Sequence, residues 1–72
     1  MTKVLHLLKG DPTLAADVMA RQVAAGDSVT VALLEGEAAA LPAGVTVRRL
    51  DADLTYEELV DLIFEAEQVV PW

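Results

Sequence analysis

Cysteine is absent from this chain of 72 residues. Its absence excludes disulfide bonds, thiolate metal sites and thiol catalysis by the chain itself. Basic residues are also scarce, because five lysines and arginines stand against twelve aspartates and glutamates, a net charge of −7. Since such a charge repels phosphate backbones, we do not expect nucleic acid as a direct partner.

Long hydrophobic runs are missing as well, although 54% of the residues are hydrophobic. No uninterrupted run approaches the roughly 18 residues of a membrane span, and the first residues lack the apolar region and cleavage site of a secretory signal. We therefore expect no membrane segment and a cytoplasmic location. A chain this short is expected to form a single domain, residues 1–72. Its surplus of apolar residues predicts an oligomer, because monomers seldom expose large apolar patches.

The first half of the chain predicts a strand, a helix and a second strand. KVLHLL (3–8) is an apolar run typical of a strand buried on both faces. A helix is expected over 12–25, because an Asp-Pro pair suits its N-cap and first position and Gly26 suits its end. SVTVALL (28–34) is rich in β-branched and apolar residues, which predicts a strand parallel to the first.

The second half predicts a connector, a strand and a second helix. EGEAAALPAG (35–44) is a connector with glycine and proline, and VTVRRL (45–50) alternates as a strand does. Thr55 and Glu58 have the spacing of a capping box, so a helix is expected from the next residue onwards. Its apolar stripe, opposite a solvated acidic side, consists of Tyr56, Leu59, Val60, Ile63 and Phe64.

The last residues complete a β-α-β-β-α-β order. QVVPW (68–72) predicts a short strand at a terminus, bulge or edge, because Pro71 has no N–H to donate within a sheet. This order predicts a small α/β sandwich, a mostly parallel four-stranded sheet with two main helices. Since two helices do not easily cover both faces of such a sheet, we expect one face or an edge to be left for a partner.

Both ends of the chain resemble a known family. VLHLLKGDP before a helix, then GDSVTVALLEGEAA, resembles the start of the DsrE/DsrF/DsrH-like family, and in particular its DsrH/TusB branch of sulfur-relay subunits. TYEELVDLIFEAEQVVPW resembles the closing segment of that branch, with an aromatic residue at the helix start, a valine-rich strand and a terminal Trp. The chain departs from the pattern where DAD (51–53) replaces a longer Asp-rich stretch, so the interactions of that stretch do not carry over.

The resemblance implies a shortened DsrE-like fold in a hetero-oligomer whose catalytic subunits carry sulfur as a cysteine persulfide. Without a cysteine, this chain cannot hold a persulfide. What the resemblance implies is a non-catalytic accessory subunit of a sulfur relay, for tRNA 2-thiolation or sulfur oxidation, with cysteine-bearing DsrE-like or DsrF-like partners. The alternative is a homo-oligomer that binds a small molecule in a pocket at the carboxyl ends of the strands.

The candidate pocket residues are His6, Lys9 and Asp11 in HLLKGDP, together with Glu35 at the end of the second strand. A histidine can act as a general base or a metal ligand. For His6 a packed, hydrogen-bonded role is favoured, because one histidine on an apolar strand makes no metal constellation. Lys9 and a helix N-terminus can hold an anion, whereas Asp11 favours capping since it places its own carboxylate there. No catalytic residue is assigned.

Aromatic residues are few, with one Phe, one Tyr and one Trp. Tyr56, Phe64 and Trp72 are the candidate interface, because aromatic side chains are enriched where subunits meet. The acidic pairs in EGE and DAD lack the spacing of an EF-hand loop. A solvated negative surface is therefore expected, and neither a metal ion nor a cofactor is predicted.

Overall fold

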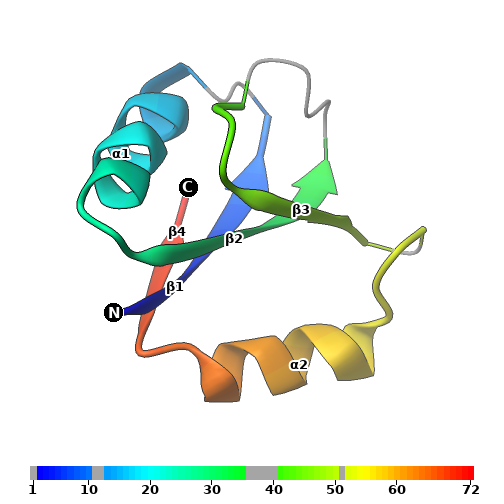
Figure 1. Ribbon diagram of the computed structural model, residues 1–72. Helices are drawn as coiled ribbons and strands as arrows, with labels where there is room; N and C mark the ends of the chain where they lie inside the picture. The colour runs from blue at the N-terminus through cyan, green and yellow to red at the C-terminus, as the bar shows by residue number, and fades with distance from the viewer. Residues whose placement is uncertain (1, 11–12, 36–40, 51) are drawn as a thin grey trace.

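The computed structural model describes residues 2–10, 13–35, 41–50 and 52–72. Within these ranges the chain forms four strands and two helices in the predicted order (Figure 1). Their bounds are β1 Lys3–Lys9, α1 Thr13–Ala24, β2 Ser28–Glu35, β3 Thr46–Arg49, α2 Tyr56–Glu65 and β4 Gln68–Pro71. The expected α/β fold is confirmed.

The four strands form one sheet in the order β3-β2-β1-β4, and every neighbouring pair runs parallel. β1 lies between β2 and β4, so its backbone is paired along both edges. The chain first extends the sheet to one side of β1 and then crosses to the other side for β4. Pro71 therefore lies on an edge strand, as its missing N–H requires.

Alternation along β1 directs its side chains into two separate cores. Leu8 packs on one face with residues of α1 and β2, namely Ala15, Met19, Val29, Val31 and Leu33. Leu5 packs on the opposite face with Ala32, Leu54 and Leu59. One helix thus covers each face, α1 on one side and α2 on the other (Figure 1). Of the two expected openings, a face or an edge, neither face is left without a helix, because the edge strands have only four residues each and the sheet is narrow. The outer edges of β3 and β4 have no partner strand in the described sheet.

α1 presents a narrow apolar stripe to the first of these cores. Ala15 and Met19 are buried and Val23 packs beside them, at a spacing of four residues. Leu14 is 75% exposed, because it lies about 100° around the helix from Ala15. The predicted Asp-Pro cap lies outside the described residues.

α2 begins with the predicted capping box. The Glu58 N–H donates to the Thr55 hydroxyl at 3.2 Å, and the Thr55 N–H donates to the Glu58 carboxylate at 3.0 Å. Leu54 and Leu59 flank this cap and are buried in the same core, as expected for a hydrophobic staple. These local contacts fix both the first residue of α2 and the direction from which the chain enters it.

The predicted apolar stripe of α2 does not face the core as a whole. Leu59 is buried, and Leu62 and Ala66 pack beside it. The other stripe residues are exposed, with exposed fractions of 66% for Tyr56, 46% for Val60, 36% for Ile63 and 83% for Phe64. Apolar positions extend around roughly half of the helix, and the narrow sheet covers only the part centred on Leu59.

The turn before β3 depends on Gly44. Its φ is +92°, and an added Cβ would lie 2.9 Å from Cγ1 of Val23 on α1. Gly26, which follows α1, has a φ of +89° with no atom within 4 Å of the corresponding position. The two glycines therefore share a left-handed backbone but differ in packing. Part of the predicted connector, residues 36–40, lies outside the described residues.

We expect Gly44→Ala to destabilise the protein more than Gly26→Ala. Each substitution places alanine in the left-handed region, which costs about 1–2 kcal/mol. Only Gly44→Ala also crowds the stiff side chain of Val23, which adds about 1 kcal/mol or more. Urea unfolding followed by circular dichroism measures both free energies of unfolding. Equal losses would show that Val23 moves aside without cost.

Candidate functional site

His6 lies in the middle of β1 with none of its surface exposed. Its side chain faces α1, where Nε2 lies 2.6 Å from Oε1 of Gln22. On the other side of the ring, Nε1–H of Trp72 donates to Nδ1 at 2.8 Å. The two rings are stacked, with 15° between their planes and 6.0 Å between their centroids. His6 thus joins β1, α1 and the residue that follows β4.

The indole of Trp72 determines the tautomer of His6. An indole nitrogen only donates, so Nδ1 of His6 accepts, and the ring proton lies on Nε2, which donates to the amide oxygen of Gln22. Both nitrogens of a neutral imidazole are engaged in this way. Neither is left for a substrate or a metal ion, so the structure shows the packed, hydrogen-bonded histidine that the sequence favours.

The other candidate pocket residues belong to the carboxyl ends of β1 and β2. Lys9 and Glu35 are register partners there, and both are exposed. The register shifts at this point, and the Gly10 N–H donates to the Glu35 carbonyl at 3.3 Å. Asp11 lies outside the described residues. The structure therefore brings Lys9 and Glu35 together and leaves the enclosed His6 out of that group.

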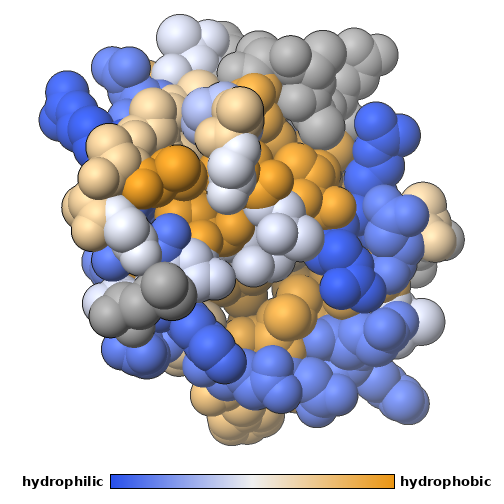
Figure 2. Space-filling model, viewed as in Figure 1, coloured by the Kyte–Doolittle hydropathy of each residue, from blue (hydrophilic) through white to orange (hydrophobic). Residues whose placement is uncertain are grey.

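Two cavities open beside α2 rather than at the carboxyl ends of the strands. One lies between α2 and the amino ends of β1 and β2, and the other, of about 170 Å³, lies between α2 and β3. The hollow between the sheet and α2 is visible in Figure 2. Sequence reasoning missed both cavities, because their lining residues come from distant segments without a shared motif. The only signal is the strand order, which places Lys3 beside Ser28.

The charged side chains that line the cavity between α2 and β3 form contacts within the protein. Arg48 of β3 lies 3.7 Å from the Glu58 carboxylate and donates to the Asp53 carbonyl at 3.0 Å. The pKa of Glu58 is lowered from its ordinary 4.5. The largest cause is the hydrogen bond from the backbone N–H of Thr55, and the Thr55 side chain and the charge of Arg48 make smaller contributions to the lowered pKa. These charges hold β3 and the start of α2 together.

The most apolar exposed surface is one flank of α2, which we call the apolar flank and define as Tyr56, Val60, Ile63 and Phe64. The opposite flank carries Glu58, Asp61 and Glu65, which line the two cavities on the β1, β2 and β3 side. Hydrophilic side chains follow α2 on that side in Figure 2. The apolar flank therefore lies on the β4 side of the helix.

The three candidate interface residues lie on two sides of the sheet. Tyr56 and Phe64 belong to the apolar flank of α2. Trp72 is 42% exposed and contacts His6, which faces α1, so its ring lies on the other face of the sheet. The feature that these surfaces share is their position beside the edge strand β4.

Across residues 2–10, 13–35, 41–50 and 52–72, no three His, Asp or Glu side chains are grouped so that they could hold a metal ion. In the same ranges, no helix is long and apolar enough to cross a membrane. The chain lacks cysteine, and its one histidine is enclosed with both ring nitrogens hydrogen-bonded.

Comparison with known proteins gives no family assignment, since no family model, no curated protein and no solved structure matches the chain. The similarity to the DsrH/TusB branch therefore rests on the residues quoted from the two ends of the sequence.

We expect Trp72→Phe to lower the free energy of unfolding by about 1–3 kcal/mol, because Nδ1 of the buried His6 loses its donor. The substitution keeps an aromatic ring but removes the N–H, together with part of the indole that packs against His6. Urea unfolding followed by circular dichroism gives the value. Tyr56→Phe is the matched control, since it removes a hydroxyl from an exposed ring and should change stability by less than about 0.5 kcal/mol. Equal stability of Trp72→Phe and the unsubstituted protein would contradict the assigned role.

The lowered pKa of Glu58 predicts a stabilisation that depends on pH. Its charged form is favoured in the folded state, so its contribution is present above the ordinary pKa of 4.5 and is lost as the pH falls through the lowered value. Glu58→Ala should therefore lower the melting temperature at neutral pH, and the difference should shrink at about pH 3. Glu57→Ala, in the same turn, is the control for helix propensity and charge. A difference that is constant with pH would show that the carboxylate charge is not involved.

Proposed function

We propose that this protein is a non-catalytic accessory subunit of a sulfur-relay assembly, similar to the DsrH/TusB branch. The observation that carries the proposal is the apolar flank of α2, in which four large side chains are exposed next to one another on the helix. None of them is charged, in a chain with a net charge of −7. Exposed patches of this kind mark surfaces that bind other proteins.

The proposed roles of this chain and its partner follow from the absence of cysteine in this chain. A persulfide needs a cysteine thiol, so the sulfur is carried by the partner chain. This chain contributes shape and charge, because its apolar flank buries against the partner while its acidic side chains oppose wrong contacts. A cytoplasmic location belongs to the proposal, since partner thiols remain reduced there.

The edge strand β4 is the proposed centre of the interface. Its outer edge is unpaired in the described sheet, and the apolar flank and Trp72 lie beside it on opposite faces. A partner that covers this edge contacts both aromatic surfaces at once. A small-molecule site at the carboxyl ends of the strands is the weaker alternative, because the two cavities described above lie elsewhere.

The proposal predicts that the tagged chain, purified from its native host, brings down a cysteine-bearing chain with sulfur bound to the thiol. Intact-mass analysis before and after reduction detects that sulfur. Phe64→Glu should weaken the association about thirtyfold or more, since it places a charge on an exposed aromatic of the interface. Leu14→Glu makes the same change at an exposed leucine of α1 and should leave the association intact.

Two results would contradict the proposal. One is recovery of the free chain alone, or only of partners without thiol-bound sulfur. The other is equal retention of the partner by Phe64→Glu and the unsubstituted protein. Both substituted side chains are exposed, so circular dichroism is expected to show an unchanged fold in each variant.

A further inference from the structure

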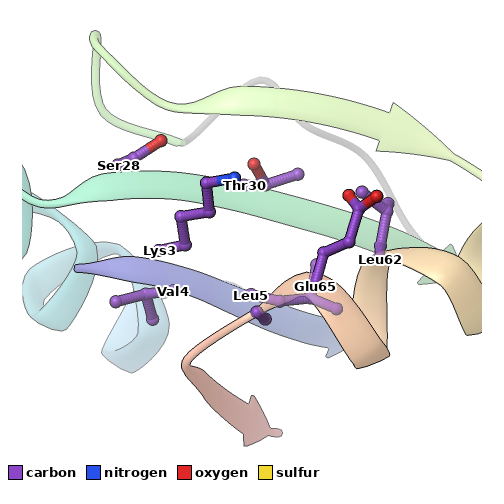
Figure 3. A pocket seen from close by; sticks show the side chains of 8 residues that line it. Lys3, Val4, Leu5, Ser28, Thr30, Leu62 and Glu65 are labelled. Atoms are coloured by element: carbon purple, nitrogen blue, oxygen red, sulfur yellow. The ribbon is translucent and has the colours of Figure 1, made fainter.

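The cavity at the amino ends of β1 and β2 combines an apolar floor with a polar rim (Figure 3). Its volume is about 160 Å³, and it is open to solvent on one side. Leu5 of β1 and Leu62 and Ala66 of α2 form the apolar part, while Lys3, Ser28, Thr30 and Glu65 provide polar groups. Sites for drug-sized ligands usually exceed about 300 Å³. The space therefore suits a ligand the size of a small metabolite.

The rim carries one positive and one negative side chain from different elements. Lys3 enters from β1 and Glu65 from the last turn of α2, and both extend over β2 (Figure 3). Among the described residues, neither side chain has an ion pair within 4.0 Å or a hydrogen bond. Each charge is therefore available to a ligand.

Hydroxyl groups accompany the positive charge. Ser28 and Thr30 are two residues apart on β2, so both point to the α2 side of the sheet, next to Lys3. Within the described part of the chain, neither hydroxyl has a hydrogen-bond partner. An ammonium group with two neighbouring hydroxyls offers several donors to a carboxylate.

The negative end of the cavity is reinforced by the end of α2. Glu65 is the last residue of this helix, and its last turn contains no basic residue. The Ala66 N–H donates a hydrogen bond to the Leu62 carbonyl. The backbone carbonyls of the helix residues that follow Leu62 point out of the helix end. A helix C-terminus carries a partial negative charge that attracts cations. Glu65 and the helix end together favour an ammonium group.

We propose that this cavity binds a free α-amino acid with a small aliphatic side chain. Its carboxylate lies at Lys3 and the two hydroxyls, its ammonium group lies at Glu65, and its side chain lies against Leu5 and Leu62. The cavity is on the flank of α2 opposite the apolar flank, so this binding does not depend on the proposed protein partner.

The test is a titration of the full-length, ¹⁵N-labelled protein with L-valine, followed by amide chemical shifts. Valine should shift the resonances of residues that line the cavity, with a Kd on the order of 1 mM. Two analogues separate the charges: 3-methylbutanoate lacks the ammonium group and 2-methylpropylamine lacks the carboxylate. Each should bind at least about tenfold more weakly than valine.

Variants test the two assigned charges. Lys3→Gln and Glu65→Gln should each weaken valine binding by about fivefold or more. The matched controls Arg21→Gln on α1 and Glu57→Gln at the start of α2 remove a charge of the same sign away from the cavity, and should leave the Kd unchanged.

Three results would overturn the proposal. Valine at about 50 mM fails to shift the cavity resonances, or an analogue with one charge binds as tightly as valine, or Glu65→Gln binds as tightly as the unsubstituted protein. Phe64→Glu should retain valine binding, and Glu65→Gln should retain the protein partner. The two proposals therefore fail separately.

Discussion

The rest of the structure is arranged around β1, a strand that is buried on both faces and paired along both edges. Leu5 and Leu8 each anchor one of the two cores, so the strand determines where both helices pack. His6 adds a polar requirement at its centre, because a buried imidazole is costly unless both nitrogens have partners. Gln22 and Trp72 meet that requirement and thereby tie α1 and β4 to the same strand.

The secondary-structure elements follow from local signals in the sequence. The apolar run of β1, the capping box at Thr55 and the staple beside it are each contained within a few residues, so spacing alone predicts them. The partners of His6 are not local, since Gln22 is 16 and Trp72 is 66 residues away. The sequence indicates that a histidine on an apolar strand needs hydrogen-bond partners. Which residues become these partners depends on how distant segments pack, and spacing in the sequence does not predict that.

α2 shows a second limit of prediction from sequence. Its apolar residues surround roughly half of the helix, and spacing does not reveal which of them turn inward. The narrow sheet selects Leu59 and its neighbours and leaves Phe64 and Tyr56 in solvent. The same orientation directs Glu65 toward Lys3 and so creates the polar cavity. The apolar flank and the polar cavity therefore both result from the orientation in which α2 packs on the sheet.

The pairing of β4 with β1 also affects the order in which the protein folds. β1, α1 and β2 are consecutive, so they can associate as soon as they have been synthesised, with little loss of chain entropy. β4 leaves the ribosome after the other three strands, and only then is the second edge of β1 covered. A nascent chain that lacks β4 exposes one backbone edge of β1, which is a template for pairing with other unfinished chains. Rapid synthesis of the segment from β2 to β4 thus protects this sheet against aggregation.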